Sequence, residues 1–210
     1  MQSNQKGLFR KLVFILVGVF FVILINASSI NPKSQETFIN NGVTPNFPDL
    51  PISVNGNAGL ATVASSGSGT YDDPYIIEDL IIDGSSYAQH LIQVTNTDAY
   101  LIIRNCTLFS TTSNFYGIYL GTVQNVMVTN NSISYTYYGV YSSGSANNLT
   151  IHDNVISHSR SMGLYLFNTQ NANVSRNLVE NSTERGIYIA TTSTDNVIEN
   201  NEVYGPQETG

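Results

Sequence analysis

From Ile77 onward, apolar residues recur in two short patterns that repeat about every 22 to 26 residues. One pattern is apolar-x-x-Asn-x-apolar, and its first position steps by 26, 25, 23, 23 and 24 residues from Ile77 to Ile198. The other is Gly-apolar-Tyr-x, whose copies start at Gly117, Gly139, Gly163 and Gly186. Short alternations of this kind are typical of β-strands, so the two patterns predict two strands in every repeat.

A repeat of 22 to 26 residues restricts the architecture to a few solenoids. Helical repeats do not fit, because the chain has no long helix-forming runs. Leucine-rich repeats need a leucine-rich helix or compact turn after the asparagine, whereas the connecting segments here read SYTYY, SHSRSM and ENSTER. Left-handed β-helices need a six-residue period, which is absent. We therefore predict an all-β fold, a single-stranded right-handed parallel β-helix of about six coils.

Strand alternation separates the core of this solenoid from its surface. The apolar neighbours of each tyrosine are expected to point inward, where successive coils stack about 4.8 Å apart. The same alternation sends one tyrosine per coil outward, and these residues are Tyr119, Tyr141, Tyr165 and Tyr188. The sequence thus predicts an exposed column of tyrosines that runs along the solenoid.

Glycine and asparagine define the corners of the predicted coils. We expect the glycine before each tyrosine strand to take positive φ at a tight corner. The central asparagines of the other pattern are expected to turn inward and to bond the next coil, as a structural ladder of Asn131, Asn154, Asn177 and Asn201. Cys106 occupies the same position in an earlier coil, where a buried, inert thiol is favoured over a reactive one.

The N-terminus has the pattern of an export signal. Lys6, Arg10 and Lys11 precede an apolar stretch of 14 residues, Leu12–Ile25, broken only by Gly18. That length is short of the roughly 20 residues of a membrane span and suits a secretory signal, although the cleavage pattern is imperfect and a retained anchor stays open. We predict three segments: a signal peptide or N-terminal anchor at 1–29, a polar linker at 30–50 and the β-helix at 51–210. The body is expected outside the cytoplasm, in the periplasm, on the cell surface or extracellular.

Composition narrows the function classes. Only 11% of the 210 residues are charged and the net charge is −7, with no basic stripe after the leader, which disfavours a nucleic-acid partner. A single cysteine rules out an internal disulfide and zinc sites of the CxxC kind. These features neither favour nor exclude an enzyme.

The segment GSGTYDDPYIIEDLIIDG at residues 67–84, followed by the coils described above, resembles the pectate-lyase-like superfamily of right-handed parallel β-helix proteins. It is most similar to the NosD-type β-helix region of exported prokaryotic, especially archaeal, surface proteins. The resemblance covers residues from about 50 to 210 and implies the fold. It leaves the function open, because the superfamily includes lyases, hydrolases, epimerases and adhesins. NosD is associated with copper delivery, so the resemblance also raises the question of a metal.

Lyases of this superfamily generally use an acidic, calcium-holding cluster beside an arginine or lysine. The corresponding residues here are Asp153 and Arg176, expected on adjacent coils, and Glu199 one coil further on. A surface ion pair is the commoner explanation of such a pattern. Residues 96–98 match the Asn-Thr-Asp motif of the related hydrolases, but the other motifs of those enzymes are absent, which favours a loop.

The sequence assigns no metal site. Calcium and copper are the only ions that the resemblance suggests. Copper would need His, Met or Cys side chains together, and His152 and Met127 are expected to be two residues out of line on neighbouring coils. This arrangement allows at most two ligands on the surface.

The tyrosine column is the most distinctive surface that the sequence predicts. Tyrosine offers ring faces to sugar C–H groups and hydroxyl groups to sugar oxygens, whereas a purely structural column would only stack. Four further tyrosines are expected at the neighbouring corner, namely Tyr116, Tyr135, Tyr137 and Tyr138.

The function that we predict is an exported, monomeric β-helix module, non-catalytic, that binds carbohydrate or serves as a surface scaffold. A polysaccharide lyase or hydrolase and a NosD-like copper-associated protein remain alternatives. The expected partner is a polysaccharide or surface glycan, and the N-terminal segment contacts the membrane if it is not cleaved. No polar cap follows the last coil, so we expect either a chain–chain contact there or a missing continuation.

Overall fold

The computed structural model describes residues 48–205, and these form a parallel β-solenoid. The predicted signal or anchor at 1–29 lies outside the described residues, as does nearly all of the predicted linker. The first strand begins at Ile52, close to the predicted start of the solenoid. No helix within residues 48–205 has the length and apolar composition that crossing a bilayer requires.

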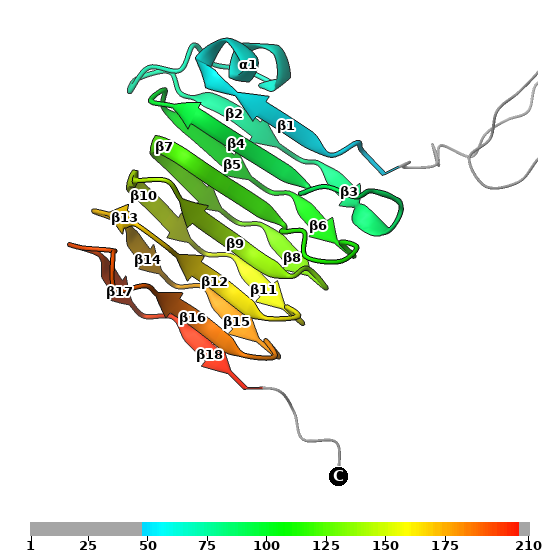
Figure 1. The fold of residues 1–210 in the computed structure, drawn as a ribbon. Coiled ribbons are helices and arrows are strands. Elements are labelled where there is room, and N and C mark those ends of the chain that lie inside the picture. The colour runs from blue at the N-terminus through cyan, green and yellow to red at the C-terminus, as the bar shows by residue number, and fades with distance from the viewer. Residues whose placement is uncertain (1–47, 206–210) are drawn as a thin grey trace, which may run out of the picture. The chain divides into compact units, whose positions relative to one another are not determined.

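Three strand faces surround the core, and all pairings between named strands are parallel (Figure 1). The first face contains β1 (Ile52–Asn55), β4 (Ile92–Thr97), the start of β7 (Ile118–Thr129), β9 (Tyr138–Ser143), β12 (Met162–Leu166) and β16 (Arg185–Ile189). The second face contains β2 (Tyr75–Glu78), β5 (Leu101–Arg104), the end of β7, β10 (Ala146–His152), β13 (Thr169–Gln170), β14 (Asn173–Ser175) and β17 (Val197–Glu199). The third face contains β3 (Ile81–Asp83), β6 (Thr107–Phe109), β8 (Ser132–Ser134), β11 (Val155–Ser157), β15 (Leu178–Glu180) and β18 (Glu202–Tyr204). The third face has six strands, one from each coil, and five full turns connect them. The prediction was about six coils.

The predicted columns are confirmed by the strand register. On the first face Ile118 pairs with Val140, which pairs with Leu164, and all three side chains are fully buried. The next member of the column, Ile187, is half-buried because it lies near the end of the described solenoid. The core is therefore a stack of aliphatic side chains, one layer per coil.

The asparagine ladder also forms as predicted. Asn154 accepts hydrogen bonds from the backbone N–H and the side-chain amide of Asn131, and its own amide donates to Asn177 at 2.9 Å. Cys106 takes the same place in an earlier coil, where its N–H donates to Asn131. The residue before each ladder position has a φ near +55°, a feature that the sequence analysis missed; these residues are Asn105, Asn130, Asp153, Arg176 and Asn200.

The prediction that the repeated glycines take positive φ at the coil corner is wrong. None of Gly117, Gly139, Gly163 and Gly186 has a positive φ. They are needed because coils approach closely: a Cβ on Gly139 would lie 2.4 Å from Cγ2 of Ile156 and 2.5 Å from the carbonyl oxygen of Gly163. Space, and not backbone conformation, therefore requires glycine at this corner.

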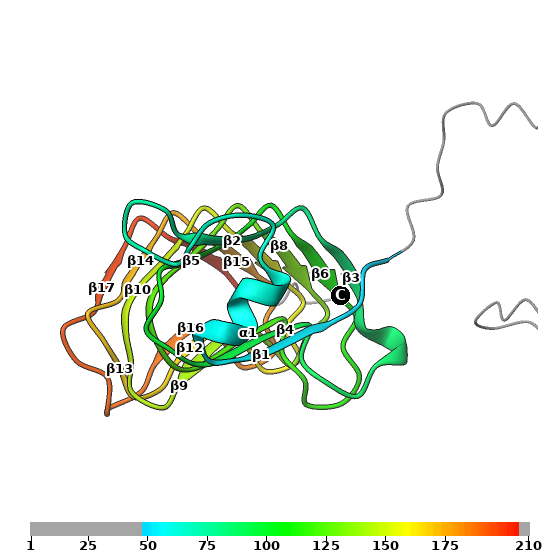
Figure 2. The ribbon, with the colours of Figure 1, turned by 90° about the horizontal axis from the view of Figure 1, so that it is seen from above.

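A short helix that the sequence did not predict covers the N-terminal end of the solenoid. Helix α1 (Gly56–Val63) lies across the open end of the coil (Figure 2) and inserts Leu60, which is fully buried, into the core. A second short element, the 3-10 helix η2 (Gly84–Ser86), follows β3. At the other end the last described coil leaves Val197, Ile198 and Val203 between 41% and 51% exposed, so no cap covers it within residues 48–205.

Candidate functional site

The structure brings the four predicted tyrosines of the first face together. Their ring centroids are 5.6 Å apart between Tyr119 and Tyr141, 5.0 Å between Tyr141 and Tyr165, and 5.1 Å between Tyr165 and Tyr188. Each tyrosine is paired in register with the next, on β7, β9, β12 and β16. All four side chains are partly exposed, and we call them the tyrosine ladder.

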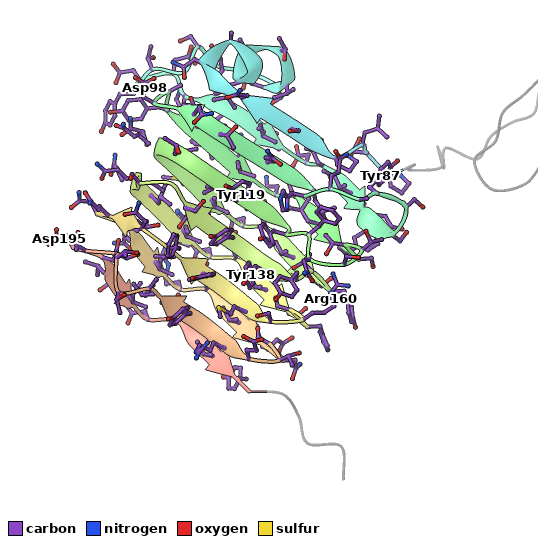
Figure 3. The ribbon with its side chains drawn as sticks, viewed as in Figure 1. Tyr87, Asp98, Tyr119, Tyr138, Arg160 and Asp195 are labelled. Atoms are coloured by element: carbon purple, nitrogen blue, oxygen red, sulfur yellow. The ribbon has the colours of Figure 1, made fainter. Side chains whose placement is uncertain are left out.

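A second aromatic row lies beside the ladder, three residues before it in the coils of Tyr119 and Tyr141. Tyr116 stacks on Tyr138 at 4.9 Å, and Tyr138 meets Tyr165 edge to face at 5.4 Å; Figure 3 places Tyr119 and Tyr138 on this face. His90 extends the row by stacking on Tyr116 at 4.3 Å. His90 was not predicted in this row, although the alignment of Ile92 with Ile118 places it there.

Tyr137 and Tyr135 differ in their placement. Tyr137 packs against Tyr138 at 4.7 Å and so extends the aromatic surface as expected. Tyr135 stacks instead on His158, and none of its ring contacts involves the ladder. One of the four additional tyrosines thus lies apart from the ladder.

The ladder exposes hydroxyl groups and ring edges more than open ring faces. The planes of Tyr119 and Tyr141 differ by only 17°, so each ring covers a face of its neighbour. At one end of the ladder the guanidinium of Arg185 lies 4.6 Å from the Tyr188 ring centroid. Sugar contact through free ring faces, as the sequence suggested, is therefore limited, and the accessible chemistry is that of a row of phenol hydroxyls.

Four hydroxyls of the ladder and the row beside it, those of Tyr116, Tyr138, Tyr141 and Tyr165, are held in the neutral state. Burial raises the pKa of Tyr116, Tyr141 and Tyr165 above the usual value, and it raises the pKa of Tyr138 to about 12. A neutral phenol both donates and accepts hydrogen bonds. The Tyr119 hydroxyl already lies 3.1 Å from Oγ of Ser143, which fixes its position.

The predicted acid–base residues lie on the second face and only partly assemble. Arg176 donates to both carboxylate oxygens of Asp153, from Nε and from Nη2, at 2.8 Å each. Nδ1 of His152 lies 2.5 Å from the same carboxylate. Glu199 is paired in register with Ser175, and its carbonyl oxygen accepts from the Arg176 N–H at 3.4 Å, whereas its carboxylate acts on the guanidinium of Arg176 through longer-range attraction.

This cluster is an ion pair with little free proton-transfer capacity. Arg176, and then His152, lower the pKa of Asp153 to about 2. A carboxylate that is this weakly basic accepts a proton poorly at neutral pH. The geometry thus fits the surface ion pair that the sequence analysis considered the commoner explanation.

Comparison with known proteins places the chain in a family. The family model described as "Right handed beta helix region" matches residues 90–210. The chain belongs to this family. A solved structure of a mutant of the periplasmic alginate epimerase AlgG is similar to this right-handed β-helix, with a TM-score of 0.50 and 20% sequence identity. The match covers 61% of this chain but only 33% of that one, and at this identity it shows the fold alone.

No curated protein matches the sequence of this right-handed β-helix significantly.

The remaining candidate residues of this right-handed β-helix are those considered for a metal site and for a reactive thiol, and their surroundings fit a structural role. Within residues 48–205, no three His, Cys, Asp or Glu side chains are arranged to hold a metal ion. Met127 pairs in register with Thr150, two residues before His152, which is the displacement that we expected. Burial raises the pKa of Cys106 to about 11, so its thiol is protonated at neutral pH.

The Asn-Thr-Asp segment at residues 96–98 ties the first face to the capping helix. Oγ1 of Thr97 donates to Oδ1 of Asn57 at 2.6 Å, and the Asn57 amide donates to Asp98 at 2.9 Å. These bonds join the turn after β4 to α1. Asn96 and Thr97 thus end β4 and only Asp98 lies beyond it, so the segment is a strand end in a structural role and not the loop that the sequence favoured.

Proposed function

We propose that this chain is an exported β-helix module of the NosD-like, pectate-lyase-like type that binds a polysaccharide or surface glycan along the tyrosine ladder, without catalysis of its own. The observation that carries the proposal is the unbroken row of stacked tyrosines over four coils. The expected location is the periplasm, the cell surface or the extracellular space.

The shape of the ladder suits a polymer. Its members repeat with the coils along the solenoid axis, so a chain lying on it meets the same group again and again. Phenol hydroxyls pair with sugar hydroxyls as donors and as acceptors, and the flanking Tyr116 and Tyr138 add apolar surface. A row of weak contacts gains affinity from repetition, as linked binding sites do.

Phenylalanine substitution tests this proposal, because it removes hydroxyls and keeps the ring stack. The purified protein is passed over immobilised neutral and acidic polysaccharides, with alginate included because the similar structure is an alginate epimerase. The double variant Tyr165→Phe, Tyr188→Phe is expected to bind about 10-fold more weakly, since each lost hydrogen bond costs about 0.5–1.5 kcal/mol. Tyr135→Phe, an exposed tyrosine outside the ladder, is the matched control. If the unaltered protein, the double variant and Tyr135→Phe are retained equally, the hydroxyls of the ladder do not bind the polysaccharide.

A polysaccharide-active enzyme is the second candidate, on the observation that His152, Asp153 and Arg176 contact one another on the second face. An enzyme of this kind would produce new reducing or unsaturated ends from one polymer of the panel. Activity that is lost in Asp153→Asn and in Arg176→Gln, but not in the ladder variants, would favour it. Glu199→Gln then tests whether the third predicted residue takes part.

A further inference from the structure

A groove on the second face lies apart from the tyrosine ladder. It has a volume of about 230 Å³ and lies over β5, β7 and β10, next to the loop before β2. Its floor includes Met127, which pairs in register with Ile102 on one side and with Thr150 on the other. The outward column that forms this floor is thus part of the regular sheet.

Two tyrosines form the aromatic wall of the groove. Tyr71 and Tyr100 meet edge to face, with centroids 5.4 Å apart and planes at 82°. Tyr71 is 76% exposed, so a face of its ring is open to a ligand, in contrast to the stacked rings of the ladder. An open aromatic ring beside polar groups is a surface on which the apolar face of a sugar ring packs.

The loop that carries Tyr71 is held in place by its backbone. The N–H groups of Ser68, Gly69 and Thr70 all donate to the carbonyl oxygen of Asp73. The Tyr100 N–H in turn donates to the carbonyl oxygen of Gly69 at 3.0 Å, which joins the loop to the next coil. The wall is therefore preorganised, which lowers the entropy cost of binding.

Polar groups without a partner lie opposite this wall. The amide of Asn148 donates to Oδ1 of Asn125 at 2.7 Å, and the amide of Asn125 donates to the backbone of Asp98, which Figure 3 labels at this corner. These bonds orient both side chains. Across residues 48–205, neither Oδ1 of Asn148 nor Oγ1 of Thr150 makes a hydrogen bond, and both residues line the groove.

The chemistry of the lining selects the ligand. Every lining residue is uncharged, so the groove offers no cation to an acidic group, and the net charge of −7 further disfavours anions. The volume is below the roughly 300–1,000 Å³ of sites for drug-sized molecules. We propose that this groove binds a single pyranose unit of a neutral saccharide, with its apolar face on Tyr71 and its hydroxyls toward Asn148 and Thr150. The site lies on another face than the ladder, so it does not depend on the proposed function.

Chemical-shift titration of the purified, full-length protein tests this site. The probes are methyl glucoside, methyl galactoside and methyl mannoside, with glucuronic acid as the charged counterpart, each up to about 20 mM because a one-sugar site is expected to bind in the millimolar range. At least one neutral glycoside is expected to shift the backbone amides of Tyr100, Met127 and Thr150. No shift with any of the three, or equal shifts with glucuronic acid, would overturn the proposal.

Three variants separate the groove from the ladder. Tyr71→Ala is expected to weaken glycoside binding at least 10-fold, and Thr150→Val, which keeps shape and loses the hydroxyl, about 3- to 10-fold. Tyr135→Ala is the matched control for loss of an exposed tyrosine, and unchanged binding in Tyr165→Phe, Tyr188→Phe shows that the ladder is not involved. Unweakened binding in both groove variants, with thermal midpoints as in the unaltered protein, refutes the assignment.

Discussion

The inward asparagine that recurs in four coils makes several buried hydrogen bonds. Asn154 accepts from the backbone N–H of Asn131 and donates to the carbonyl oxygens of Val128 and His152, while it also bonds Asn177. Its side chain is almost fully buried. No apolar residue satisfies these backbone groups, which explains why asparagine recurs at this corner.

Replacing this asparagine is expected to destabilise the fold strongly. Asn154→Ala removes the acceptor of the Asn131 N–H and a buried donor to the Val128 carbonyl, so the free energy of unfolding should fall by about 2–4 kcal/mol in urea titrations. Asn147→Ala, which removes an outer bond to the amide of Asn171, is the control and should change it by less than about 0.5 kcal/mol. Similar losses in both variants would contradict the role given to the inner ladder.

Glycine at the coil corner gives a second prediction at the residue scale. Gly139→Ala adds a methyl group where Ile156 and Gly163 leave no room, so the free energy of unfolding should fall by about 1–3 kcal/mol. Gly205→Ala adds the same methyl group where no atom lies within 4 Å, and should have no effect beyond about 0.5 kcal/mol. A harmless Gly139→Ala would show that the coils can move apart at this corner.

The aromatic surface formed by the tyrosine ladder and the row beside it makes stability depend on alkaline pH. Burial raises the pKa values of Tyr116, Tyr138 and Tyr141 in the folded state above the usual value near 10, so the unfolded chain loses these protons first as the pH rises. The stabilisation is complete below about pH 10 and is lost as the pH rises toward 12. Absorbance titration should show a late-ionising group of tyrosines that unfolding abolishes. Tyr138→Phe should remove one member of that group.

The capping helix contributes one fully buried side chain, that of Leu60. Leu60→Ala leaves a cavity between α1 and the first coil and should lower the free energy of unfolding by about 2–5 kcal/mol. Ala61→Ser, at an exposed position of the same helix, should leave it within about 0.5 kcal/mol of the unaltered protein. If both variants unfold at the same urea concentration, the helix does not stabilise the end of the solenoid.

The coils were predictable at the scale of elements because each column repeats the same residue type. The pairing of Tyr119 with Tyr141 and of Asp153 with Arg176 followed from counting residues alone. Helix α1 was not predictable in this way, since Leu60 is its only fully buried residue and belongs to no column that repeats from coil to coil. The groove was missed for a similar reason, because the loop that carries Tyr71 forms it by folding over a neighbouring coil.

At the scale of the whole molecule, the solenoid is a one-dimensional stack in which each coil contacts only its neighbours. A central strand such as β9 pairs with β7 and β12 and lies under the stacked tyrosines. The strands of the last described coil, β17 and β18, each pair on one side only. Stability in such a stack is a sum of local terms, so it should vary along the axis.

Hydrogen exchange measures this variation directly. Amides of β7, β9 and β10 should exchange only through global unfolding, whereas amides of β17 and β18 should exchange through local opening at much lower free energy, because Val197 and Val203 are about half exposed. Helix α1 should give β1 and β4 protection that the opposite end lacks, and Leu60→Ala should remove it selectively. Uniform protection from β1 to β18 would mean that all coils unfold as one cooperative unit. In that case Leu60→Ala and Asn154→Ala would each lower the protection of every amide by the amount that the variant lowers the global free energy of unfolding.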